Sequence, residues 1–95
     1  MTELPVIFNP VADRGRAASR KEELEKELEK LGIKPLFFLT TRPGEATEIA
    51  RGLVRKRVAV VAAAGGDGTL NEVAQALAGT NTALGIIPLL SLIHI

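Results

Sequence analysis

A glycine-rich segment at the end of a run of small aliphatic residues is the part of the sequence best suited to chemistry. The stretch AAAGGDGTLNEV, residues 62–73, places Gly65, Gly66 and Gly68 around Asp67 and directly before Thr69. Glycine permits positive φ angles and lets backbone N–H groups approach an anion without obstruction by Cβ atoms. A helix N-terminus behind such a loop adds partial positive charge. The segment therefore predicts a phosphate-binding loop.

Asp67 makes that prediction more specific. A carboxylate inside a phosphate loop repels the ligand unless Mg²⁺ bridges the two groups or the carboxylate accepts a hydroxyl hydrogen bond. No lysine follows the glycines as in a P-loop, and Asn71 occupies the third glycine place of the dinucleotide-binding motif. Asp67 thus indicates that the ligand is a nucleotide bound together with a metal ion. In the competing interpretation, Thr69 and Glu72 form a capping box and the glycines serve only a turn.

The remaining sequence alternates between strand-like and helix-like patterns. Apolar runs predict strands at residues 4–8, 36–39, 58–63 and 83–87, with both faces of the second strand buried. Apolar residues at helical spacing predict helices over about 15–31, 46–54 and 70–77. In the first helix the expected apolar face holds Ala17, Leu24, Leu28 and Leu31, with Gly32 as the C-terminal cap. The predicted fold is therefore α/β, an open and mainly parallel sheet with helices on its faces.

This topology predicts where a ligand binds. Ligands of open α/β sheets bind beyond the carboxyl ends of the strands. Asn9 ends the first predicted strand, Thr40 and Thr41 follow the second, and residues 65–69 follow the third. We expect these residues to meet at one edge of the sheet.

Composition excludes several classes of function. A net charge of +1 and the absence of Trp and Tyr argue against a nucleic-acid partner. There are no cysteines, so disulfides and thiolate metal sites are excluded. The N-terminus lacks the pattern of a signal peptide, and the longest apolar stretch is too interrupted for a bilayer span, which favours a cytoplasmic protein of one small domain.

Four segments together carry a family resemblance. GGDGTLNEV, NP after the first strand, TTRPGEA after the second and LGIIPL after the third helix resemble the N-terminal half of the catalytic domain in the diacylglycerol kinase and sphingosine kinase superfamily, especially bacterial lipid kinases. The resemblance implies ATP-dependent, Mg²⁺-assisted transfer of the γ-phosphoryl group to a lipid hydroxyl. It also implies a cytoplasmic enzyme, peripheral at the inner membrane face, that meets a membrane surface transiently.

The resemblance also assigns roles to individual residues. It implies that Asn9 and Thr41 contact the nucleotide and that the loop of Gly65, Gly66, Asp67, Gly68 and Thr69 holds the ATP phosphates, with Asp67 as the Mg²⁺ ligand. Asn71 and Glu72 are expected to shape the same site. No catalytic residue is assigned within residues 1–95.

Two segments depart from the family pattern. Asp13 stands where a glycine is usual, and the final LSLIHI replaces the family's GT-x-ND segment. One coding sequence for these last residues resembles a transposon end used in sequencing adapters. We therefore expect residues 1–89 to be the ATP-binding subdomain, residues 90–95 a non-native tail, and the C-terminal β-rich domain, with its general base and lipid groove, to be absent, leaving the 95-residue chain inactive.

Other functions remain open at this point. In an NAD kinase the aspartate of the loop would meet a ribose hydroxyl instead of a metal. The chain could equally be a noncatalytic nucleotide-binding module or an inactive gene fragment. The lipid acceptor and the oligomeric state are left open by the sequence.

Overall fold

The computed structural model describes residues 2–10 and 17–88. Its elements alternate as predicted: β1 (Thr2–Phe8), α1 (Ala17–Lys30), β2 (Ile33–Leu39), α2 (Glu45–Arg55), β3 (Val60–Gly65), α3 (Asp67–Leu77) and β4 (Ala83–Pro88). The expectations for Asp13, for a helix start at Gly15 and for a tail at residues 90–95 lie outside the described residues.

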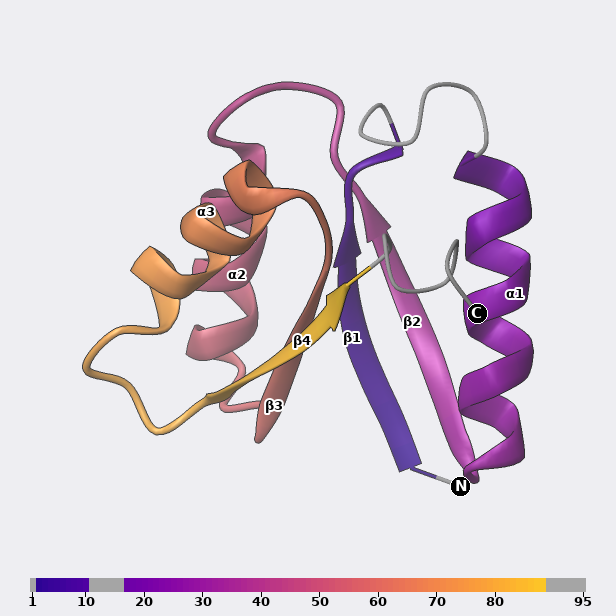
Figure 1. Cartoon of the computed structure of the whole chain (residues 1–95). Coiled ribbons are helices and arrows are strands. Elements are labelled where there is room, and N and C mark those ends of the chain that lie inside the picture. The colour runs from indigo at the N-terminus through magenta and orange to yellow at the C-terminus, as the bar shows by residue number, and fades with distance from the viewer. Residues whose placement is uncertain (1, 11–16, 89–95) are drawn as a thin grey trace.

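The strands form one parallel sheet in the order β2-β1-β3-β4. Helix α1 lies on one face and the pair α2 and α3 on the other (Figure 1). The open, parallel α/β fold predicted from the alternating pattern is confirmed. Within the described part of the chain, no helix is long and apolar enough to span a membrane.

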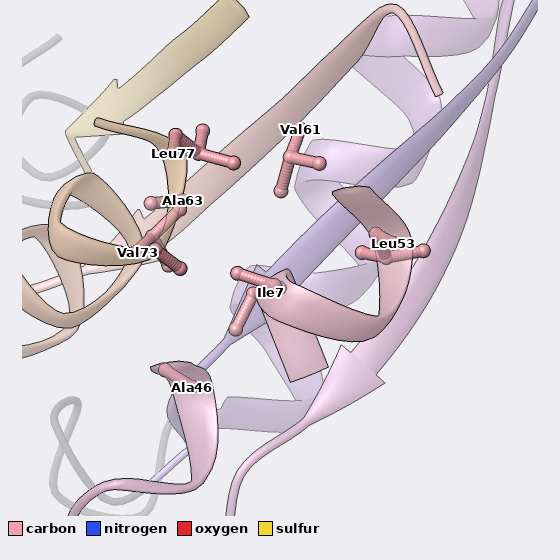
Figure 2. Packing of buried hydrophobic residues seen from close by; sticks show 9 residues of the cluster. Ile7, Ala46, Leu53, Val61, Ala63, Val73 and Leu77 are labelled. Carbon is pink, nitrogen blue, oxygen red and sulfur yellow. The ribbon is translucent and has the colours of Figure 1, made fainter. Parts of the chain in front are cut away.

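Both faces of the central strands are buried, which explains their continuously apolar sequence. In β1, Ile7 points toward α2 and α3, where it packs with Leu53, Val61 and Val73 (Figure 2). Its neighbours Val6 and Phe8 belong to the cluster on the opposite face, beneath α1. The sheet is thus fixed by two apolar layers.

Two burial predictions are wrong. Leu31, expected on the apolar face of the first helix, is 73% exposed because α1 ends at Lys30 and the chain turns at Gly32, whose φ is +77°. The turn itself confirms Gly32 as the C-terminal cap, since its N–H donates to the Glu29 carbonyl at 3.0 Å. In β2, Leu39 is 47% exposed because β2 lies at the edge of the sheet.

Candidate nucleotide-phosphate site

The carboxyl ends of β1, β2 and β3 lie at one edge of the sheet, which is the upper end in Figure 1. Backbone hydrogen bonds hold the strand ends level: Thr40 N–H donates to the Phe8 carbonyl at 3.0 Å and Asn9 N–H to the Ala64 carbonyl at 3.3 Å. β1 and β3 are neighbours although β2 intervenes in sequence, and this reversal of strand order is where open sheets bind ligands.

A cleft of about 280 Å³ opens at this edge. Its lining residues are Asn9, Thr40, Thr41, Arg42, Pro43, Ala46, Gly68, Thr69 and Glu72. Of the site residues predicted from the sequence, the structure brings Asn9, Thr41, Gly68, Thr69 and Glu72 together at this cleft. The sequence prediction missed Arg42, Pro43 and Ala46 as lining residues, although they belong to the same TTRPGEA segment as Thr41.

Four predicted site residues do not line the cleft. Gly65 lies beneath it, against the side chains of Asn9 and Thr69. Gly66, Asp67 and Asn71 are exposed, with Gly66 and Asp67 at the start of α3. The glycine loop therefore forms one wall of the cleft and its adjoining rim.

The glycines differ in why they are needed. Positive φ was expected for the loop, but only Gly65 has it, at +156°. Gly66 is extended, with φ −91° and ψ −171°, and Gly68 lies inside α3. A Cβ added at Gly65 would lie 3.1 Å from Thr69 Oγ1, whereas at Gly66 or Gly68 it would meet nothing within 4 Å. The described structure needs a glycine at position 65 and leaves free space at the other two.

The capping-box interpretation is wrong. The N-cap of α3 is Gly66, without a side-chain cap, so Thr69 lies inside the helix, where it is buried. The Glu72 carboxylate turns away from its own helix: Oε1 accepts a hydrogen bond from Ala46 N–H of α2 at 3.2 Å. Thr47 Oγ1 in turn donates to the Glu72 carbonyl at 2.8 Å. These bonds join α3 to the start of α2.

The loop between β2 and α2 is ordered by charged groups. Glu45 Oε1 accepts two hydrogen bonds from Thr41, one from the backbone N–H and one from the hydroxyl at 3.0 Å. These bonds lower the pKa of the Glu45 carboxyl. Arg42 Nη2 lies 3.0 Å from Glu48 Oε2, and this hydrogen-bonded pairing raises the pKa of Arg42. Arg42, whose guanidinium is paired with Glu48, thus lines the cleft on the side of the loop between β2 and α2.

The donor set fits a phosphate ligand with its own metal. The first N–H groups of α3 have no acceptor inside the helix and can donate to anion oxygens. Among the described residues, no group of three or more His, Cys, Asp or Glu side chains could hold a metal ion. Mg²⁺ is commonly held by one or two carboxylates together with substrate phosphates and water, so Asp67 alone suits a metal that arrives with a polyphosphate.

Comparisons with known proteins agree with this geometry. The family described as "Diacylglycerol kinase catalytic domain" matches residues 3–91. The chain is 32% identical over 90 residues to "Diacylglycerol kinase" of Bacillus subtilis (strain 168) and 35% identical over 86 residues to that of Staphylococcus saprophyticus, covering 93% and 88% of this chain. A crystal structure of a diacylglycerol kinase from Bacillus anthracis str. Sterne superimposes with a TM-score of 0.77 at 27% identity over 90% of this chain. The chain spans only 30%, 28% and 32% of these relatives.

Proposed function

The chain belongs to the diacylglycerol kinase catalytic domain family, and we propose that it binds the phosphates of ATP for transfer of the γ-phosphoryl group to a lipid hydroxyl. The observation that carries this proposal is the unhindered backbone at Gly66 and Gly68, where a Cβ would meet only open space. Where such a glycine lies at or beside the cleft, a ligand that comes close to the main chain explains it; Gly52 is equally unobstructed but does not line the cleft. The family match favours a lipid kinase over the NAD kinase alternative.

In this proposal the two walls of the cleft contact different parts of the nucleotide. The N–H groups of Gly66, Gly68 and Thr69 bind phosphate oxygens, helped by the positive end of α3. Asn9 and Thr41, on the loops after β1 and β2, lie toward the nucleoside. Arg42 lines the same side of the cleft with its guanidinium paired to Glu48. The acceptor is a lipid hydroxyl reached at the cytoplasmic membrane surface.

Asp67 is proposed to hold Mg²⁺ together with the phosphates. When bound, the metal neutralises phosphate charge as the γ-phosphoryl group leaves. Asp67 begins α3 and is exposed beside the glycines, so its carboxylate can reach a ligand at the helix N-terminus. The negative charge of Asp67 also interacts favourably with the positive end of α3. This smaller structural role stabilises the helix by about 0.3–1 kcal/mol.

Titration of the 95-residue chain with ATP, in the presence of Mg²⁺ or of EDTA, tests the proposal. We expect ATP to bind and Mg²⁺ to tighten binding about tenfold or more, since a bridging cation removes the repulsion between Asp67 and phosphate. Asp67→Asn should bind ATP equally with and without Mg²⁺. Glu25→Gln, on an exposed position of α1, makes the same charge change away from the cleft. Undiminished Mg²⁺ dependence in Asp67→Asn would contradict the metal assignment, and the absence of ATP binding would contradict the function.

A further inference from the structure

Glu72 links the two walls of the cleft through a pair of partly buried hydrogen bonds. Its Oε1 accepts from Ala46 N–H at 3.2 Å, and its backbone carbonyl accepts from Thr47 Oγ1 at 2.8 Å. Glu72 belongs to α3, whose first turn carries Gly68 and Thr69. Ala46 and Thr47 belong to α2, which directly follows the loop that carries Thr41 and Arg42. The pair of bonds therefore fixes one wall relative to the other.

Ala46 has a particular need for this acceptor. It is the second residue of α2, so its N–H has no partner within the helix. The N-cap of α2 is Gly44, which offers no side-chain oxygen. Ala46 is only 2% exposed, so a missing acceptor would leave a buried donor unsatisfied. A carboxylate also suits the positive end of a helix. Glu72 thus caps a helix other than its own.

We infer that Glu72 is a positioning residue for nucleotide binding, acting through Ala46 N–H and not as a phosphate or metal ligand. This inference rests on the proposed function. The two bonds, from Ala46 N–H to the Glu72 carboxylate and from Thr47 Oγ1 to the Glu72 carbonyl, form one link that sets the separation between the N-terminus of α3 and the loop of Thr41 and Arg42. When it is lost, α2 and its preceding loop move relative to the glycine loop, and the cleft no longer matches a nucleotide that must reach both walls.

Thr47 provides the sharpest test, because its side chain shares the link but does not line the cleft. Thr47→Val replaces the hydroxyl by a methyl group of similar size, and we expect Mg-ATP to bind about threefold to tenfold more weakly, the range expected for one lost hydrogen bond. Thr82→Val is the matched control: Thr82 Oγ1 donates to the Val58 carbonyl at 2.9 Å, another partly buried hydroxyl-to-carbonyl bond. It lies at the opposite end of the sheet, so Thr82→Val should cost similar stability and leave affinity unchanged.

Variants of Glu72 separate positioning from direct ligation. Glu72→Gln keeps an acceptor for Ala46 N–H, and Glu72→Ala does not. We expect Glu72→Gln to lose clearly less affinity than Glu72→Ala, since the acceptor and not the charge is what α2 requires. Amide hydrogen exchange gives a readout without nucleotide: the Ala46 amide should be protected in the unmodified chain and exchange at least tenfold faster in Glu72→Ala.

The outcomes are distinguishable. Weaker Mg-ATP binding by Thr47→Val than by Thr82→Val, with faster Ala46 exchange in Glu72→Ala, supports the inference. Unchanged affinity in Thr47→Val overturns it, as does a Glu72→Gln variant as impaired as Glu72→Ala, which would make Glu72 a charged ligand. Equal exchange rates of the Ala46 amide in the unmodified chain and in Glu72→Ala also overturn the inference, whether or not nucleotide binds. An unmodified chain that binds no Mg-ATP refutes the proposed function and removes the premise of the inference.

Discussion

Replacing Gly68 by alanine should make the protein more stable and should weaken its binding of nucleotide. Gly68 lies in the first turn of α3, and a Cβ there would meet nothing within 4 Å. Alanine in a helix interior is favoured over glycine by about 1 kcal/mol, partly through lower entropy of the unfolded chain. Because Gly68 lies near the N-terminus of its helix, we expect roughly half of this gain in the free energy of unfolding. For a domain of this size, 0.5 kcal/mol corresponds to a rise in melting temperature of about 2–4 °C.

The effect on binding has the opposite sign. Gly68 lines the cleft, so the added methyl group occupies space from which a phosphate oxygen would approach the backbone N–H. A hydrogen bond to a charged group contributes about 1.5–3 kcal/mol. Its loss should therefore weaken Mg-ATP binding by about 10-fold to 150-fold.

Gly52 supplies the matched control. It lies within α2, a Cβ there would also meet nothing within 4 Å, and it does not line the cleft. Gly52→Ala should raise stability by about 1 kcal/mol and leave Mg-ATP affinity unchanged. Thermal unfolding and calorimetric titration of both variants measure the two effects. A Gly68→Ala protein that is stabilised and still binds Mg-ATP with wild-type affinity would refute the phosphate-cradle reasoning.

Two further predictions concern the loops around the cleft. The hydrogen bonds from Thr41 hold the pKa of Glu45 below its ordinary value of 4.5, so their stabilisation is present above pH 4.5 and is lost as the pH falls through the folded-state pKa. Urea unfolding should therefore show Glu45→Gln less stable than the unmodified chain at pH 7, with the gap in the free energy of unfolding closing as the pH falls below 4.5 and through the folded-state pKa; an unchanged gap contradicts this account. Gly65→Ala should lose about 1–2 kcal/mol of stability, because its Cβ would lie 3.1 Å from Thr69 Oγ1 at a φ of +156°; chemical denaturation with no loss would mean that the loop relaxes freely.

The fold was largely predictable because each element carries its own periodic signal. In β1 an unbroken apolar run predicted a buried strand, and the structure confirms it for Val6 and Ile7. The burial of both faces that was predicted for β2 is wrong. Leu39 ends an equally apolar run yet is 47% exposed, because exposure depends on whether a strand is central or at an edge. Strand order is set by long-range pairing, which local periodicity does not contain.

Topology was enough to predict which residues lie together at the candidate site, but not which hydrogen bonds they form. Parallel strands end at a common edge, and this alone placed Asn9, Thr41 and Thr69 beside one cleft. The spacing of Thr69 and Glu72 satisfied the capping-box pattern, yet the helix begins early enough to put Thr69 inside it. The Glu72 carboxylate then finds an N–H 26 positions away in the chain. Such a partner is decided by how α2 packs on α3.

The three glycines of the loop separate what the fold requires from what a ligand requires. Gly65 is accounted for by its own backbone and by the closeness of Thr69, and a purely structural interpretation of the loop explains it fully. That interpretation does not extend to Gly68, which weakens the helix that it lies in and touches nothing that a methyl group would disturb. Gly66 is extended and equally unobstructed. A turn needs one glycine here, and the proposed polyphosphate against the main chain would account for the other two.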